Sequence, residues 1–523
     1  MFKYLSIIIL VIFTNHTKAQ TTWAGEAAQV LFDNCTSCHN PNGIAPNSLM
    51  TFPLANAYAS SIKSYVVSNE MPPWTADTSY QHYSQERVLT QAEYDILISW
   101  VDDGALEGNA SQAPAPPIYN GSQQLFATPD LVINAPNYMS KATNFQDDYV
   151  CFVLPSGLTQ DRKIKAIEVI PGNLNTVHHC LVYSDATNSN STDTIGGDCG
   201  GPVLGSLMMG YTPGATPTVF PASSSFTSGM VLKAGSDIIL AMHYPEGSYG
   251  TYDQTKVHFY FYDEPVTNFR EIFAAPIISD WSFTIAANTV DSLEVEFDNV
   301  AIDFTLLSVF PHMHLLGQQI ESHALTATNE IIPLVNIPEW DFEWQDFYWF
   351  EHMKKIPAGS KIIGKAKYDN TSSNHHNPNS PPQNISAGLN TSDEMFLIYY
   401  HYMFYENGDE NINVDSLTKV YLAAQEPNGI ETFNINNSNS FPNPFKKSTF
   451  INFNLKENAF VNLSIYDIKG QIVKKIISKD LKPRQYNIEW NATNTENNIV
   501  GSGIYYYSLS INGNLSSGKL IKL

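Results

Sequence analysis

Histidines in strand-like segments are the residues of this sequence best suited to chemistry. The heptapeptide PHMHLLG contains His312 and His314, and the apolar run before it predicts a β-strand. Alternate side chains of a strand point to the same face, so these two histidines would face one way and Met313 the other. Two imidazoles on one face are half of a metal site, although an isolated pair also occurs on the rims of sheets.

Two further histidine segments lie upstream. TVHHCLVY contains His178 and His179, which a regular strand would send to opposite faces. Both can bind one ion only where the backbone bends, and the preceding PGN favours a bulge. ILAMHYPEG places His243 at a strand end, 64 residues beyond His179. Imidazole suits copper and zinc, whereas a thioether favours Cu(I), and NTSDEMFLIYYHYMFY offers Met395 or Met403 as that ligand.

A haem-attachment pattern stands near the start of the chain. The string CTSCH contains Cys35 and Cys38, with His39 directly after them. Two thiols at this spacing can form thioethers to the vinyl groups of a haem, and the histidine is placed to be an axial ligand of its iron. The pattern therefore predicts one covalently bound haem c, and the alternative use of the two thiols is a disulfide.

A second axial ligand of the haem iron is expected downstream of His39. The segment NEMPPW supplies Met71 in a proline-stiffened loop, and the alternative is Met50, which lies in an apolar stretch typical of a core. A histidine and methionine pair favours a raised potential and electron transfer over oxygen binding. With the helical pattern LTQAEYDILISWVDDGA, these segments resemble a small cytochrome c domain over residues 22–108, followed by a proline-rich linker at 109–124.

The bulk properties of the chain restrict its location and its partners. With 523 residues, 43% of them apolar, and a formal charge of −23, it is globular, multidomain and repelled by nucleic acids and anionic membranes. Residues 1–19 have a lysine, a short apolar run and a small-residue stop, which is the plan of a signal peptide. No later stretch has the ~20 apolar residues of a membrane span. We expect an exported protein with no transmembrane segment and no nucleic-acid partner.

The middle of the chain has the pattern of an all-β region. Short runs of β-branched and aromatic residues alternate with breaks rich in Gly, Pro, Asn and Asp. Strands at this density predict a mainly β fold with two jelly-roll-like β-sandwiches, over residues 125–270 and 271–430. The runs that carry this prediction are AIEVIPG, DIILAMHY, KVHFYFYDE, SLEVEFDN, TLLSVFPHMH, KIIGKAKYD and MFLIYYHYMFY.

The order of the histidine and methionine motifs resembles one enzyme family. VHHCLVY, LAMHY, HMHLLG and TSDEM follow one another as in the copper type II monooxygenases, the group of peptidylglycine α-hydroxylating and dopamine β-monooxygenases. The resemblance covers most of residues 140–410. It implies one copper ion that stores and passes an electron, and a second that binds O2 and attacks a substrate C–H bond. The implied ligands are His178, His179 and His243 for the first ion, and His312, His314 and Met395 for the second.

The expected substrate side departs from this family. Peptide-hydroxylating members resemble one another in an arginine two residues before the HxH, where this chain has Phe310, and in an asparagine two residues after the methionine, which is Leu397 here. Tyr399 keeps the position of a family tyrosine and joins His312, His314 and Met395 as a candidate catalytic residue. His401 is a candidate for a supporting contact. The resemblance thus implies a more apolar or aromatic pocket, and the cluster WDFEWQDFYWF is either part of its lining or ordinary core.

Three cysteines outside CTSCH are scattered along the chain. In an oxidising compartment they allow one intramolecular disulfide and leave one thiol over. Cys180 with Cys199 would close a short polar loop, and Cys151 could replace either one. The spacing does not choose between these pairings.

The end of the chain differs in charge and pattern from the rest. Residues 441–523 hold 11 Lys+Arg and 5 Asp+Glu, whereas the chain before them is strongly acidic. SIYDIKGQIV, SGIYYYSL and the closing KLIKL resemble the C-terminal sorting domain of type IX secretion substrates, expected as a small β-sandwich over residues 431–523. The alternative is a carbohydrate-binding or structural β-domain. The resemblance implies the type IX secretion machinery as a partner and a final location outside a Gram-negative cell or on its surface, reached through the periplasm.

These features together favour an exported copper-dependent monooxygenase that hydroxylates an unknown small organic substrate with O2. Its expected cofactors are two copper ions and one haem c. Electrons would come through the haem from an unidentified donor, in place of or alongside ascorbate or another reductant. The competing interpretation is a non-catalytic surface protein that transfers electrons or binds copper on the same scaffold.

Overall fold

The structure is a computed structural model. It describes residues 20–418 except 42, 118, 120–123, 126, 145, 197–204, 224–225 and 299, and residues 439–523 except 442, 456–458, 468–471, 483, 497 and 512–513. The chain divides into two compact units between residues 422 and 423. The fold is mainly β, as predicted. The expected signal peptide lies outside the described residues, and none of the described helices has the length and apolar character needed to cross a membrane.

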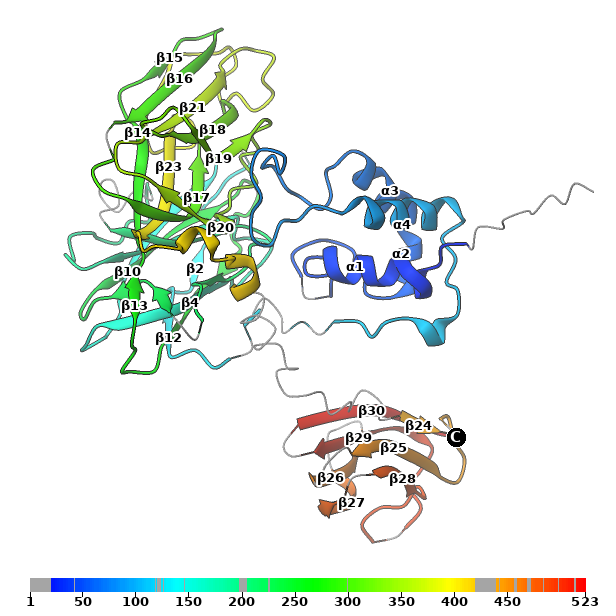
Figure 1. Ribbon diagram of the computed structural model, residues 1–523. Coiled ribbons are helices and arrows are strands. Elements are labelled where there is room, and N and C mark those ends of the chain that lie inside the picture. Colours follow the sequence, from blue (N-terminus) through cyan, green and yellow to red (C-terminus); the bar gives the residue numbers. More distant parts are fainter. Residues whose placement is uncertain are drawn as a thin grey trace, which may run out of the picture. The chain divides into compact units, whose positions relative to one another are not determined.

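A group of short helices opens the described chain (Figure 1). Leu31, Leu97 and Trp100 are fully buried in its core. The predicted helix after NEMPPW is confirmed, and it begins at a capping box in which Thr90 and Glu93 each accept a hydrogen bond from the other's backbone N–H. The helices are η1 (Trp23–Ala27), α1 (Ala28–Asn34), α2 (Phe52–Ala57), α3 (Ala59–Val67) and α4 (Gln91–Asp102), with the short turns η2 (Ala110–Gln112) and η3 (Asp409–Asn411) further along the chain.

Two sheets with a shared core form a first β-sandwich. Val182, Leu240 and Phe259 meet in this core from both sheets. One sheet runs β1 (Leu131–Asn134), β12 (Lys256–Phe261), β4 (Arg162–Ile170) and β7 (Thr218–Val219), with β9 (Val231–Leu232) also paired to β4. The other runs β3 (Asp148–Pro155), β10 (Asp237–Tyr244), β5 (His179–Asp185) and β6 (Ser206–Tyr211). Two small pairs flank them, β2 (Tyr138–Met139) with β11 (Tyr252–Asp253) and β8 (Thr227–Gly229) with β13 (Phe269–Glu271).

A second β-sandwich follows in the chain. Leu306, Ile398 and Ile320 belong to its core and come from both of its sheets. One sheet runs β14 (Phe273–Asp280), β23 (Phe396–Phe404), β17 (Phe304–His312) and β20 (Tyr348–Ile356). The other runs β16 (Val290–Phe297), β21 (Lys361–Asp369), β18 (Gly317–Leu325) and β19 (Ile331–Ile337), and β15 (Thr284–Ile285) pairs with β22 (Ile385–Ser386) beside them. All seven predicted β-runs are strands.

The segment between α3 and α4 packs into the second sandwich. Tyr83 forms an antiparallel bridge with Phe350, and the Ser84 N–H donates to Trp349 O at 2.7 Å. Tyr83 and the adjacent Trp74 lie in or against the core of that sandwich. The range predicted for the haem module therefore contains a stretch that binds it tightly to the β-sandwich region.

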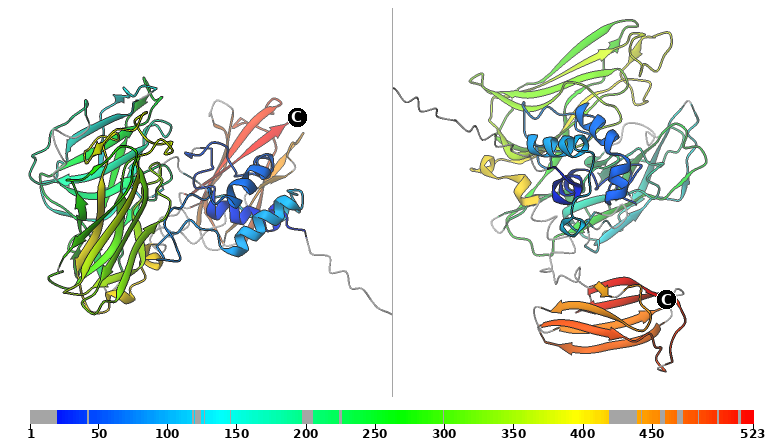
Figure 2. Two further views of the ribbon diagram at one scale, coloured as in Figure 1. Left: turned by 90° about the horizontal axis from the view of Figure 1, so that it is seen from above. Right: turned by 90° about the vertical axis from the view of Figure 1, so that its right-hand side faces the viewer.

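The second compact unit is a small β-sandwich of its own, drawn in orange and red in Figure 2. Ile451, Leu463 and Leu509 are buried in its core. Its sheets are β24 (Asn439–Phe441), β25 (Thr449–Leu455) and β28 (Arg484–Trp490), and β27 (Ile472–Leu481), β26 (Ala459–Tyr466), β29 (Gly503–Ile511) and β30 (Asn514–Lys522). This is the architecture predicted for the tail.

Candidate metal centre

Three histidines of the first sandwich converge on one point. The register pairs His243 on β10 directly with His179 at the start of β5, and His178 lies just before that strand. Because strand pairing begins only at His179, His178 is not forced to the opposite face. The three Nδ1 atoms lie 3.0–3.3 Å from one another. Two imidazole nitrogens about 2.0 Å from one ion lie roughly 2.8–3.5 Å apart at angles of about 90–120°, so the spacing fits a shared cation.

The outer nitrogens of this first cluster face acidic side chains. His178 Nε2 hydrogen-bonds to a carboxylate oxygen of Glu343, and His243 Nε2 lies 3.2 Å from Asp147 Oδ2. A carboxylate oxygen is a hydrogen-bond acceptor and favours an N–H facing it, so both rings carry their proton on Nε2 and keep on Nδ1 a lone pair that points inward. Lone pairs that face one another at this distance repel unless a cation lies between them. The donor set thus fits a copper ion, which neutral imidazole binds well.

Burial keeps the imidazoles of His179 and His243 in the first cluster neutral. Burial, with the charges of His243, His178, His312 and His314, holds the pKa of His179 well below its usual value. Burial also lowers the pKa of His243, and the hydrogen bond with Asp147 only partly offsets it. Neutral histidines are the metal-binding form, so the site is prepared for a cation near pH 7.

The predicted pair of PHMHLLG forms a second cluster. The rings of His312 and His314 have centroids 5.1 Å apart and stand at 88° to each other. His312 Nδ1 donates to Gln345 Oε1 at 2.5 Å, and His314 Nδ1 donates to Asp393 O at 3.2 Å. Both Nε2 atoms are left with a free lone pair for an ion. Met313 is fully buried in the core of the second sandwich, as expected for the residue that faces away.

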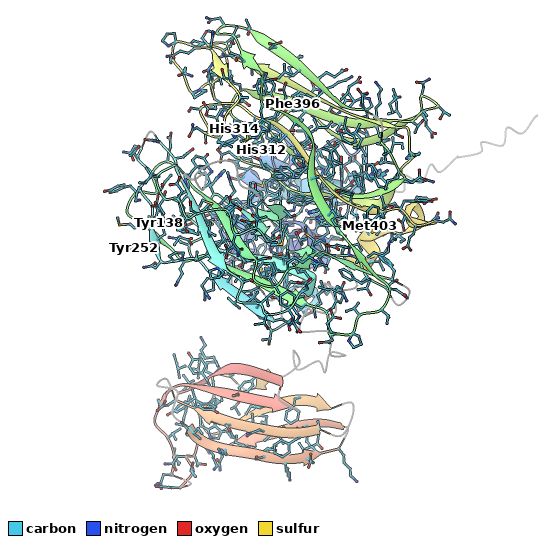
Figure 3. The ribbon with its side chains drawn as sticks, turned by 90° about the vertical axis from the view of Figure 1, so that its left-hand side faces the viewer. Tyr138, Tyr252, His312, His314, Phe396 and Met403 are labelled. Carbon is cyan, nitrogen blue, oxygen red and sulfur yellow. The ribbon has the colours of Figure 1, made fainter. Side chains whose placement is uncertain are left out.

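The strand register distinguishes between the two candidate methionines. His312 on β17 pairs with Leu397 on β23, and continuing the antiparallel register places Met395 opposite His314. Met403 pairs with Thr305, seven residues before His312, and is buried in the core of the first sandwich. Figure 3 shows Met403 well away from the two histidines. The alternative ligand Met403 is therefore wrong, whereas Met395 is placed beside the cluster.

A buried carboxyl group organises this second cluster. Glu394 accepts backbone N–H bonds from His314 at 3.0 Å, Leu316 at 2.7 Å and Met395 at 3.0 Å. Burial raises the pKa of Glu394 to about 8, against the lowering effect of these bonds. One side chain thus ties the loop that carries His314 to Met395, the residue directly before β23.

Replacing Glu394 tests this role. Glu394→Ala is expected to lower the free energy of unfolding by about 3 kcal/mol or more, because several buried N–H groups lose their acceptor at about 1–3 kcal/mol each. Glu394→Gln keeps one acceptor oxygen, so its free energy of unfolding should fall by less. Urea denaturation of the metal-free protein measures both, with the exposed neighbour change Ser392→Ala as the control. Equal stability of Glu394→Ala and Ser392→Ala would contradict the role.

The metal-free protein is expected to lose stability as the pH falls below about 6.5. Burial lowers the pKa of His312 to about 4 and that of His314 to about 3, from 6.5 in the unfolded chain. Below 6.5 the unfolded chain therefore binds more protons than the folded one. Each histidine then lowers the free energy of unfolding by at most about 1.4 kcal/mol per pH unit, down to its folded pKa. Denaturation of the wild type and of a His312→Asn, His314→Asn variant at pH 7.5 and 5 measures this, and identical pH dependence in both would contradict it.

The predicted substrate side is aromatic and closely packed. Phe310 stacks on Phe347 with centroids 4.6 Å apart, and its ring lies 6.2 Å from that of His312. Tyr399 pairs with Phe310 across the strands, and burial raises the pKa of its hydroxyl. Leu397, the register partner of His312, is nearly buried. Phe310 and Leu397, the two positions where polar substrate anchors were considered, thus form an apolar surface beside the second cluster.

His401 packs away from the metal ligands. Its Nδ1 lies 2.8 Å from Ser308 Oγ, and its ring stacks between Phe347 at 4.8 Å and Trp349 at 5.1 Å. The structure thus places His401 in an aromatic layer, so the supporting role suggested for it is not favoured. The WDFEWQDFYWF cluster is divided: Phe347 and its successors are mostly core, whereas the preceding turn reaches both histidine clusters.

The remaining cysteines do not follow the first predicted pairing. Cys180 is a free thiol and is fully buried in the first sandwich, so the predicted disulfide between Cys180 and Cys199 is wrong. Cys151 is disulfide-bonded, and Cys199 lies outside the described residues. Cys180 packs in the core because it directly follows His179 on β5, where its side chain points to the opposite face.

The CTSCH residues lie at the end of α1. Cys35 and Cys38 are both free thiols, and burial raises the pKa of Cys35 to about 12. His39 Nδ1 donates to two backbone carbonyls at 3.1 Å each, which leaves its Nε2 lone pair available. Met71 follows α3 and is 39% exposed. These features fit an attachment site, and the haem ligands remain a prediction.

Two segments of the chain match known protein families. Residues 279–425 match the C-terminal domain of the copper type II ascorbate-dependent monooxygenases, and residues 439–523 match the secretion system C-terminal sorting domain. The chain thus contains a domain of the copper monooxygenase class, and its tail is that of an exported protein, secreted or held at the cell surface by the type IX pathway. The resemblance predicted for these two segments is confirmed.

Similarity to solved structures is weak. PorZ, a surface component of the type IX secretion system of Porphyromonas gingivalis, is 16% identical over 18% of this chain and 12% of its own, with a TM-score of 0.14. Dimeric latent PorU of the same organism is 10% identical over 71% of this chain and 34% of its own, also with a TM-score of 0.14. The VP2 subviral particle of infectious bursal disease virus is 9% identical over 60% of this chain and 92% of its own, with a TM-score of 0.13. The chain spans well under two thirds of the length of PorZ and of PorU. TM-scores this low support no argument about fold or function. No curated protein matches the chain.

Proposed function

We propose that this chain is an exported copper-dependent monooxygenase that hydroxylates a C–H bond of an apolar or aromatic organic substrate. The observation that carries the proposal is the convergence of three histidine Nδ1 atoms within 3.3 Å of one another, in a chain that also matches the copper monooxygenase domain. His178, His179 and His243 would hold one copper ion, and His312, His314 and Met395 the other. When bound, copper supplies the one-electron chemistry that lets O2, two electrons and two protons convert a C–H bond to an alcohol and water.

The different donor sets suit two different roles. Three imidazoles of similar strength can hold an ion in both of its oxidation states, which an electron store needs. A thioether prefers Cu(I), so the cluster beside Met395 is the better place for the ion that meets O2. Phe310, Leu397 and Tyr399 would bind the substrate near that ion through apolar contacts. Their character supports a substrate without the carboxylate of a peptide.

A haem c on Cys35, Cys38 and His39 would supply the electrons. The close approach of the attachment segment to the first sandwich supports this part of the proposal. A Cβ atom on Gly214 would lie only 3.0 Å from Cys38 Sγ, and Arg87 hydrogen-bonds to Gly214 O. Gly214 follows β6, which pairs with the strand that begins at His179. A haem held here would therefore be tethered close to the histidine cluster, which raises the effective concentration of the donor.

Oxygen uptake tests the proposed function. The full chain is loaded with copper, reduced, and exposed to O2 in the presence of alkyl and aryl compounds or of peptides with a free carboxylate. We expect two copper ions per chain and O2 consumption that rises with the apolar compounds at least about tenfold more than with the peptides, because a missing partner of a charged group costs about 1.5–3 kcal/mol. Two bound copper ions that never reoxidise with any compound would favour the electron-transfer alternative.

A further inference from the structure

A short turn of the second sandwich touches both histidine clusters. The turn, Asp341–Gln345, lies between β19 and β20 and is held by its own hydrogen bonds. The Glu343 N–H donates to Asp341 Oδ1 at 2.8 Å, and Gln345 Nε2 donates to Phe342 O at 2.8 Å. The guanidinium carbon of Arg87 lies 5.0 Å from the ring centroid of Trp344 and braces the turn from the helical module. The turn is therefore a compact unit and not a loose loop.

Side chains of this turn orient one histidine in each cluster. Glu343 accepts the hydrogen bond from His178 Nε2, which directs His178 Nδ1 toward the first cluster. Two residues later, Gln345 accepts the hydrogen bond from His312 Nδ1, which leaves His312 Nε2 for the second cluster. The two imidazoles are thus held in opposite tautomers by neighbouring side chains of one turn.

The ring of Phe342 lies between the two clusters. Its centroid is 6.5 Å from that of His178 and 6.4 Å from that of His243, both in the first sandwich. On the other side it is 6.1 Å from His314 of the second sandwich. One aromatic side chain therefore contacts ligand candidates from both sandwiches. A shift of the turn would change the packing of Phe342 against both clusters.

We propose that the Asp341–Gln345 turn is a latch that couples metal binding at the two histidine clusters. An ion that fixes His178 also holds Glu343, and through the rigid turn it keeps Gln345 and His312 in the orientation that the second ion needs. The first ion fixes the position of this compact turn relative to the first sandwich, so the second ion binds with a smaller loss of conformational entropy. Coupling of this kind is reciprocal and typically amounts to about 5-fold to 150-fold in affinity. Glu343 and Gln345 are positioning residues, because they act through the ligands.

Metal titration tests the latch without any turnover. The metal-free full chain is titrated anaerobically with Cu(I) against a competing chelator, and X-ray absorption identifies the ion that has a sulfur ligand. We expect Glu343→Ala to weaken the sulfur-ligated ion about 5-fold or more, although Glu343 does not touch that cluster. His243→Ala, which removes the first site, should weaken it similarly, and the double variant should be no weaker than His243→Ala alone. Glu339→Ala, an exposed glutamate of the same loop, should match the wild type.

The outcomes separate the latch from the proposed function on which it rests. A wild type that binds fewer than two ions, or none with a sulfur ligand, would contradict the function itself. A wild type that binds both ions, with a sulfur-ligated site unchanged in Glu343→Ala and His243→Ala, would leave the function intact and refute the latch. Because the Glu343 side chain is largely exposed, its removal should not prevent folding.

Discussion

Met395→Ile is expected to abolish O2 consumption by the reduced, copper-loaded protein while one copper ion stays bound to the histidines of the first cluster. The change removes the thioether that favours Cu(I) and keeps a side chain of similar volume in a nearly buried position. A swap of this kind usually costs less than about 1.5 kcal/mol of stability, so the protein should fold. Copper content and O2 uptake are measured on the same sample.

Met403, which lies on β23 eight residues after Met395, provides the matched control for the Met395 substitution. It lies in the core of the first sandwich and pairs with Thr305, far along the strand from His312. Met403→Ile should therefore keep both copper ions and normal O2 uptake. Loss of O2 uptake in Met403→Ile but not in Met395→Ile would reverse the assignment, and loss of both ions in Met395→Ile would show that the two sites are wrongly divided.

His243→Ala is expected to remove one of the two copper ions and to reduce turnover by more than about 100-fold. Loss of a contact to a ligand already costs about 10-fold to 100-fold, and here the ligand itself is lost. His243 is also the residue that joins the cluster to β10, where it pairs with His179. The remaining ion should keep the spectroscopic signature of a sulfur ligand, because Met395 and its neighbours are untouched.

His323→Ala is the control for the first cluster. His323 lies on β18 and contacts Glu321, outside both histidine clusters. Its replacement should leave two copper ions and full turnover. A His243→Ala protein that retains two copper ions would contradict the first site, because three imidazoles with converging Nδ1 atoms are the reason for placing an ion there.

Local patterns predicted the strands and the grouping of the histidines well. Alternation placed Met313 in the core and His312 beside His314, because a strand and its immediate continuation follow the period of two. The same rule required a departure from regular pairing at His178, and pairing begins only at the next residue. Strand composition was equally informative, since β-branched and aromatic runs have few other stable arrangements.

Contacts made by distant residues could not be predicted in this way. Glu394 binds backbone groups about 80 residues away, and Glu343 reaches His178 across 165 residues and between two sandwiches. The acidic and aromatic residues of WDFEWQDFYWF are evident in the sequence, but their contacts depend on how the two sandwiches pack against each other. Adjacency to the methionine in TSDEM was the only local signal for Glu394, and it does not distinguish a buried carboxylate from a solvated one.

The predictions that failed did so for related reasons. Pairing Cys180 with Cys199 rested on a short loop between them, yet the alternation that directs His179 to the histidine cluster sends Cys180 into the core. Met403 was a candidate because it shares a segment with Met395, and only the register with β17 separates them. Spacing along the chain was insufficient in both cases, because the pairing partner decides which face a side chain occupies.

In the proposed reaction the two clusters together insert one oxygen atom into a substrate. The most direct measurement is mass spectrometry of the product formed by the copper-loaded full chain under 18O2, with apolar alkyl and aryl compounds as substrates. We expect a hydroxylated product that carries one 18O atom, and we expect the Met395→Ile protein to form none of it. A product whose oxygen comes from water, or equal labelling with Met395→Ile, would contradict the proposed reaction.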